Sequence, residues 1–86
     1  MNNIKLNTLP IHHDGIIENL NCDDTIRRRF LDLGLIKGTT ITPIFISPSG
    51  DPTAYQVRGS VIAIRKEDSK NITVKPVLWK YICIKI

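Results

Sequence analysis

Residues 40–65 read TITPIFISPSGDPTAYQVRGSVIAIR, a stretch that predicts short strands joined by two chain reversals. Its first seven residues are β-branched or aromatic except for one proline, which is the composition of a strand. Pro43 has no amide proton to give to a neighbouring strand, so we expect it at an edge or a bulge. The turn-forming cluster at residues 47–52 must reverse the chain, and Gly59 marks a second, tighter hairpin.

An amphipathic helix of two to three turns is expected just before this stretch. Asp23, Asp24 and Thr25 supply short polar side chains that accept free amide protons, and the aspartates place negative charge at the positive end of the helix dipole. Apolar residues then recur at i, i+4 and i+7, and a glycine that can adopt the left-handed conformation ends the helix. These residues are Ile26, Phe30, Leu33 and Gly34.

The remaining segments predict further short elements around this pattern. Residues 16–20 are expected to form a first short strand and residues 72–74 a last one. Residues 4–11 are expected to be an irregular entry, and residues 66–71 a short 3₁₀ turn. Five short strands with one or two short helices predict a mainly β domain. The arrangement expected is a small closed or half-closed barrel, which removes free sheet edges.

The C-terminal end of the chain differs from the rest. As a strand it would carry apolar side chains on both faces, interrupted only by two lysines. Such a strand left in solvent would be an aggregation hazard, so something should cover it. We divide the chain into a barrel at residues 1–75 and an apolar extension at residues 76–86, expected to be an extra strand. Three coverings stay open: its own barrel, a second protomer in a homodimer through residues 77–86, or a partner protein.

The net charge of +4 is concentrated in the C-terminal third of the chain. Residues 1–57 hold five basic and six acidic side chains, whereas residues 58–86 hold seven basic and two acidic ones. This asymmetry fits an acidic protein partner, an anionic membrane surface, nucleic acid or a solvated strand face. No basic start precedes a long apolar run, and the most apolar stretch is too short for a membrane helix. We therefore expect a soluble, cytoplasmic protein.

Nucleic acid is the least favoured of these partners. At helical spacing Arg27, Arg28 and Arg29 spread around the helix and do not form one patch. No aromatic residues are interleaved with them to stack on bases. We expect a solvated helix face and no nucleic-acid partner.

Catalytic patterns are absent from the sequence. It has no GxxxxGK[ST] phosphate-binding loop, and no serine has a patterned histidine and acid partner, so we expect no enzyme activity. His12, His13 and Cys22 are the candidate metal ligands, for Fe²⁺ or another divalent ion bound weakly. Adjacent residues on an extended strand point to opposite faces, so the two histidines would not easily share one ion. Solvated loop histidines and reduced thiols at Cys22 and Cys83 are the simpler interpretation.

The proline-rich loop offers a better candidate for a binding surface. A rigid loop framed by two prolines, beside a tyrosine, could form part of a shallow protein-recognition surface. The same residues are equally well explained by a hairpin that needs glycine and proline to take its shape. With one residue of the next hairpin and one of the extension, the candidate partner-binding set is Pro48, Gly50, Asp51, Pro52, Tyr55, Arg58 and Trp79.

Taken in order along the chain, these motifs resemble the FeoA family, ferrous iron transport protein A. Residues 29–38 are similar to the family pattern of a leucine, then glycine-leucine, then a glycine before a strand. Residues 47–52 resemble its proline-glycine-aspartate-proline turn, and residues 55–65 its central hairpin. Each motif alone is weak, but the ordered set covers residues 6 to 75, while the extension has no counterpart in the family core.

The resemblance implies an SH3-like barrel that works with FeoB, a membrane transporter whose cytoplasmic part carries a GTP-binding domain. The implied role is a non-catalytic interaction module that binds and modulates this domain. Through the transporter, the protein would be recruited to the inner face of the plasma membrane. The alternative is a metal-responsive regulatory domain that binds a transition-metal ion directly, as the similar C-terminal domains of metal-dependent repressors suggest.

Overall fold

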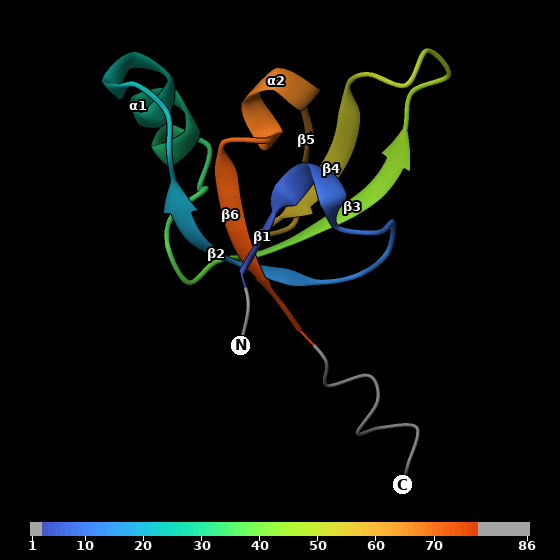
Figure 1. Cartoon of the computed structure of the whole chain (residues 1–86), viewed down its shortest axis with the longest axis horizontal. Helices are drawn as coiled ribbons and strands as arrows, with labels where there is room; N and C mark the ends of the chain where they lie inside the picture. Colours follow the sequence, from blue (N-terminus) through green and yellow to red (C-terminus); the bar gives the residue numbers. More distant parts are fainter. Residues whose placement is uncertain (1–2, 78–86) are drawn as a thin grey trace, which may run out of the picture.

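The computed structural model describes residues 3–77, which form a six-stranded antiparallel sheet in the order β1-β6-β2-β3-β4-β5. The sheet curls into a small open barrel with both helices at the same end (Figure 1). Its elements are β1 (Ile4–Lys5), η1 (Leu6–Thr8), β2 (Gly15–Leu20), α1 (Asp24–Asp32), β3 (Thr40–Ile46), β4 (Thr53–Val57), β5 (Ser60–Ile64), α2 (Lys66–Ser69) and β6 (Ile72–Pro76). The mainly β fold with one or two short helices is therefore confirmed.

Helix α1 forms where its start and stop signals predict it. The Asp23 carboxylate accepts a hydrogen bond from the Ile26 amide at 3.2 Å, which satisfies one of the free donors of the first turn. Gly34 follows the helix with a φ of 95°, a conformation that costs a residue with a Cβ about 1–2 kcal/mol. Phe30 is buried and brings the helix onto the barrel.

The core consists of side chains that alternate along the strands and point into the barrel. In β6, for example, Ile72 and Val74 are fully buried, whereas Lys75 is exposed. Full burial of such an aliphatic side chain contributes about 1.5–3 kcal/mol relative to exposure. The core cluster is Leu6, Leu9, Ile17, Leu20, Phe30, Leu35, Ile41, Tyr55, Val57, Ile64, Ile72 and Val74.

Two local predictions need correction. The entry segment is not wholly irregular, because β1 pairs antiparallel with β6, with Ile4 opposite Val74. Two residues are too few to show the alternation that predicts a strand. Residues 66–69 form a short α-helix rather than a 3₁₀ turn. Pro43 lies beside an irregularity in the β3–β4 register, as its missing amide proton predicts.

Strand β6 carries the barrel to Pro76, one residue past the predicted boundary. The Val77 amide donates to the Asp14 carbonyl at 3.0 Å and continues the pairing with the chain before β2. The predicted extra strand at residues 76–86 and the predicted homodimer through residues 77–86 both depend on residues 78–86, which lie outside the described residues. No helix within residues 3–77 is long and apolar enough to cross a membrane.

Candidate protein-interaction site

The loop between β3 and β4, residues 47–52, is held by its own hydrogen bonds. The hydroxyl groups of Ser47 and Ser49 both donate to the Asp51 carbonyl, at 2.8 and 2.9 Å. The Ser47 amide donates to the Pro52 carbonyl, and the Gly50 amide to the Ser47 carbonyl. Gly50 has a φ of 92°, and the peptide bond between Asp51 and Pro52 is cis. Pro48, Ser49 and Gly50 are exposed at the tip, so the loop presents a small fixed surface.

Asp51 is half-buried, and its carboxylate has a partner within the fold. One of its carboxylate oxygens accepts a hydrogen bond from the Lys66 amide at 2.8 Å, at the start of α2. The carboxylate therefore satisfies a free donor of the first helical turn from a distant loop. This hydrogen bond ties the candidate loop to the helix beside it, which the sequence pattern did not indicate.

Tyr55 was expected on the recognition surface, and this expectation is wrong. Its side chain is 2% exposed and belongs to the core cluster beneath the loop. Burial raises the pKa of Tyr55, and side-chain hydrogen bonding with Ser69 and Thr53 opposes the rise. Ser69 is itself buried and donates to the Lys66 carbonyl at 3.2 Å. Tyr55 thus supports the loop and α2 from inside the barrel.

Arg58 lies at the other end of β4 and does not join the loop. It occupies the two-residue turn before β5, with a φ of 52°, and its side chain packs near Gly34. The five residues of β4 separate it from the loop by about 17 Å of extended chain. Trp79 lies outside the described residues, so its place in the candidate set stays a prediction.

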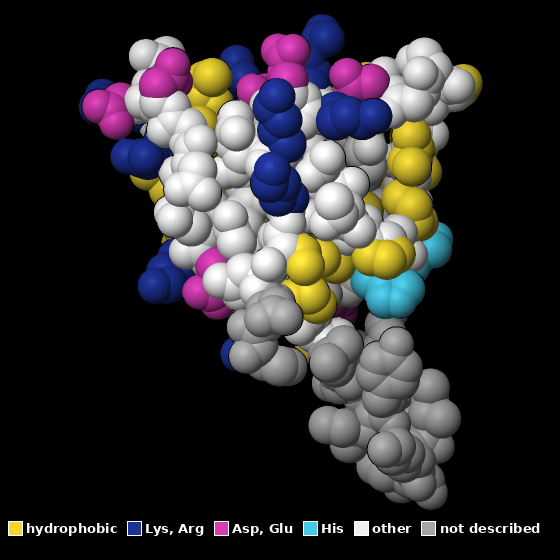
Figure 2. All heavy atoms as spheres, in the orientation of Figure 1, with side chains coloured by type: hydrophobic (Ala, Val, Ile, Leu, Met, Phe, Trp, Pro, Cys, Tyr) yellow, Lys and Arg dark blue, Asp and Glu magenta, His cyan; other side chains and the backbone are white. Residues whose placement is uncertain are grey.

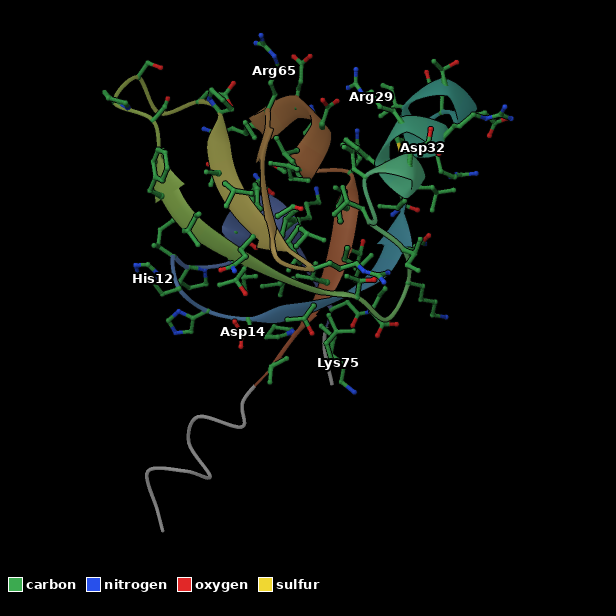
Figure 3. All side chains as sticks on the ribbon, turned by 180° about the vertical axis from the view of Figure 1, so that it is seen from behind. His12, Asp14, Arg29, Asp32, Arg65 and Lys75 are labelled. Carbon is green, nitrogen blue, oxygen red and sulfur yellow. The ribbon has the colours of Figure 1, made fainter. Side chains whose placement is uncertain are left out.

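The candidate metal ligands do not come together. His12 and His13 precede β2, as the view from behind shows for His12 (Figure 3), whereas Cys22 follows this strand. The six residues of β2 keep them about 20 Å apart. Burial raises the pKa of Cys22; Arg27 opposes the rise, and Asp23 and Asp68 add to it. Within residues 3–77, no group of three or more His, Cys, Asp and Glu side chains is placed to hold a metal ion.

Two of the three consecutive arginines of α1 have different partners. Arg27 forms an ion pair with Asp24 at 3.4 Å and donates to two backbone carbonyls. Arg29 lies 3.9 Å from Asp68 of α2 and 5.9 Å from the centre of the Phe30 ring. Arg27 therefore contacts its own helix and the chain before it, whereas Arg29 reaches toward α2.

An exposed apolar surface beside the loop is the main feature that sequence reasoning missed. Phe45 and Ile46, at the end of β3, are 57% and 51% exposed. Hydrophobic side chains gather along this side of the molecule and extend down to the histidines (Figure 2). The branched and aromatic composition of residues 40–46 predicts a strand but does not indicate that its second half lies open.

The barrel, its helices and its fixed loop define the class of small SH3-like domains. A solved structure of Stenotrophomonas maltophilia FeoA, described as a procaryotic SH3 domain protein complexed with zinc, is 30% identical to this chain. The match covers 81% of this chain and 87% of that one, with a TM-score of 0.69.

The FeoA domain model matches residues 4–76, so the chain belongs to the FeoA family, whose members take part in ferrous iron transport. An FeoA-like protein from Clostridium acetobutylicum is 31% identical, with 91% of each chain covered and a TM-score of 0.81. The resemblance and the SH3-like fold expected from the sequence are both confirmed.

A longer relative joins two transport proteins in one chain. It is an Fe²⁺ transport protein A/Fe²⁺ transporter FeoB fusion protein of Porphyromonas gingivalis, 28% identical over 72 residues. The match covers 84% of this chain but only 8% of the fusion protein. This chain therefore corresponds to a small part of that relative.

Proposed function

We propose that this protein is a non-catalytic interaction module that binds and modulates the cytoplasmic GTP-binding region of a FeoB-type ferrous iron transporter. The observation that carries the proposal is the Porphyromonas gingivalis relative, in which the two partners are one polypeptide. Covalent linkage gives each domain a high effective concentration near the other, so two domains that are fused are expected to interact. We expect the domain to lie in the cytoplasm and to reach the inner face of the membrane through the transporter.

The β3–β4 loop supports a docking role. Pro48, Ser49 and Gly50 stand exposed on a frame of hydrogen bonds that is complete before any partner binds. A preorganised loop loses little conformational entropy on binding, so more of the contact energy appears as affinity. Asp51 and Tyr55 act beneath this surface, and Arg58 lies too far away to extend it.

Calorimetric titration with the purified cytoplasmic region of the cognate transporter tests the proposal. We expect binding by the full chain, and a loss of about tenfold or more in affinity for Pro48→Glu, since a charge would be placed in the centre of the contact. Val61→Glu is the matched control, because Val61 is 59% exposed on β5 and lies away from the loop. The rate of GTP hydrolysis by the transporter region, measured in parallel, reports modulation.

Two results would count against the proposal. If the full chain fails to bind with GTP, with GDP and without nucleotide, the docking role is wrong. Equal affinities for Pro48→Glu and the unaltered chain would instead move the contact away from the loop.

A further inference from the structure

The half of the sheet formed by β3, β4 and β5 has no charged side chain in its strands. Asp, Glu, Lys and Arg make up 23% of the chain, yet none of them occurs in these three strands. Each of the other three strands carries a charged residue, which is Lys5 in β1, Glu18 in β2 and Lys75 in β6. Depletion of charged residues is the compositional feature that distinguishes the centre of a protein–protein interface from the rest of a surface.

Phe45 projects from the outer face of this half of the sheet. The strand register places Phe45 opposite Ala54 of β4, and Ala54 opposite Ala63 of β5. Residues directly opposite one another in antiparallel strands point to the same face, so the three side chains form one row across the sheet. Phe45 and Ala63 are exposed at the two ends of the row, and Ala54 is buried between them. The aromatic ring therefore stands above its neighbours, because the side chain of an alanine ends at its Cβ.

This ring continues the surface of the β3–β4 loop. Phe45 precedes Pro48 by three residues, so at most about 11 Å of extended chain separates their Cα atoms. Ile46 lies between them and is also more than half exposed. A partner seated on the tip of the loop can therefore reach Phe45 and keep its contact with Pro48.

The distribution of charge decides which kind of partner fits this surface. The net charge of +4 makes two copies of the chain repel one another. An anionic membrane or a nucleic acid would be attracted by cations around Phe45, and the stretch from Thr39 to Gly50 contains none. The surface fits an uncharged, apolar pocket on another protein that takes up one aromatic ring.

We propose that Phe45 is the anchor of the transporter contact and inserts its ring into an apolar pocket on the cytoplasmic region of the transporter. This role rests on the proposed function and adds the chemistry of the contact. The burial of apolar surface around Phe45 supplies the affinity, and the basic charge of the chain does not. The loop tip at Pro48 then lies beside the anchor and orients the two partners.

Calorimetric titration of the full chain with the purified cytoplasmic region of the cognate transporter tests the anchor. Phe45→Ala should lower the affinity by about tenfold or more and make the heat-capacity change of binding less negative, because less apolar surface is buried. Phe45→Leu keeps most of the apolar bulk and should lose clearly less affinity. Leu31→Ala is the matched control, because Leu31 is 43% exposed on α1, on the side of the molecule away from the loop (Figure 1). It should bind as the unaltered chain does.

The salt dependence of the affinity gives a second measurement. Salt screens contacts between charges, so the affinity of the full chain should change by less than about threefold between about 0.05 and about 0.5 M sodium chloride. A steep fall with salt would overturn the proposal. If the full chain binds and Phe45→Ala binds equally well, the anchor is wrong while the docking function stands. If the full chain does not bind at all, the proposed function fails, and the anchor fails with it.

Discussion

The two turns on either side of β4 reverse the chain by different physical means. The 47–52 loop is shaped by side chains, since the Ser47 and Ser49 hydroxyls and the Asp51 carboxylate all form hydrogen bonds to the backbone. The turn of Arg58 and Gly59 is shaped by the backbone alone, with φ values of 52° and 83° at its two residues. A turn that depends on backbone conformation only reverses the direction of the chain. A turn that depends on side chains can also hold a neighbouring helix in place, as Asp51 does for α2.

Tyr55 lies on β4 between the two turns, and its ionisation should lower the stability of the folded barrel. Its raised pKa means that folding favours the neutral phenol. Stability is unaffected below the unfolded pKa of about 10 and falls above it, by at most about 1.4 kcal/mol per pH unit, because the unfolded chain then binds fewer protons. Denaturant unfolding measured from about pH 8 to about pH 11 should show this fall in stability. Tyr55→Phe should show a shallower one; identical slopes would contradict the assignment.

Gly59 tests the turn that depends on the backbone. Gly59→Val places a β-branched residue at a positive φ and should reduce the free energy of unfolding by about 2 kcal/mol. No heavy atom lies within 4 Å of the position where a Cβ would be added, so crowding plays no part. Gly59→Asn is the matched control, because asparagine tolerates this conformation better and should lose clearly less stability. Equal losses for both variants would mean that the conformation is not the cause.

Asp51 tests the turn that depends on side chains. Asp51→Ala removes the acceptor of the Lys66 amide and should cost about 1 kcal/mol, with faster hydrogen exchange at the start of α2. Ser49→Ala is the control, because the exposed Ser49 hydroxyl can be replaced by water and should change stability by less than about 0.5 kcal/mol. Unchanged exchange in α2 after Asp51→Ala would show that the loop does not hold the helix.

The elements predicted from the sequence are those whose signals are local. Asp23 and Gly34 mark α1, and Gly59 marks the β4–β5 turn, because caps and left-handed glycines act within a few residues. Strand β1 escaped prediction since its pairing with β6 joins residues about 70 positions apart in the sequence. Local patterns carry no information on such a contact.

The candidate site was predicted less well than the fold, for a related reason. The loop itself has a local composition signal, and the structure confirms its position. Tyr55 could not be assigned to the inside of the barrel, because both Ala54 and Tyr55 are buried and simple alternation fails there. The exposure of Phe45 depends on where β2 begins, which is a property of the assembled sheet.

The pairing of β1 with β6 has a consequence for how this barrel can be connected. Because Ile4 lies opposite Val74, residues 3 and 77 lie within about 10 Å of one another, at the end of the barrel away from the helices (Figure 1). A domain whose first and last residues lie close together can be inserted into a larger polypeptide without distortion of its fold. The same geometry would allow circular permutation, with a short linker from residue 77 to residue 3 and new termini at the exposed tip between Ser49 and Gly50.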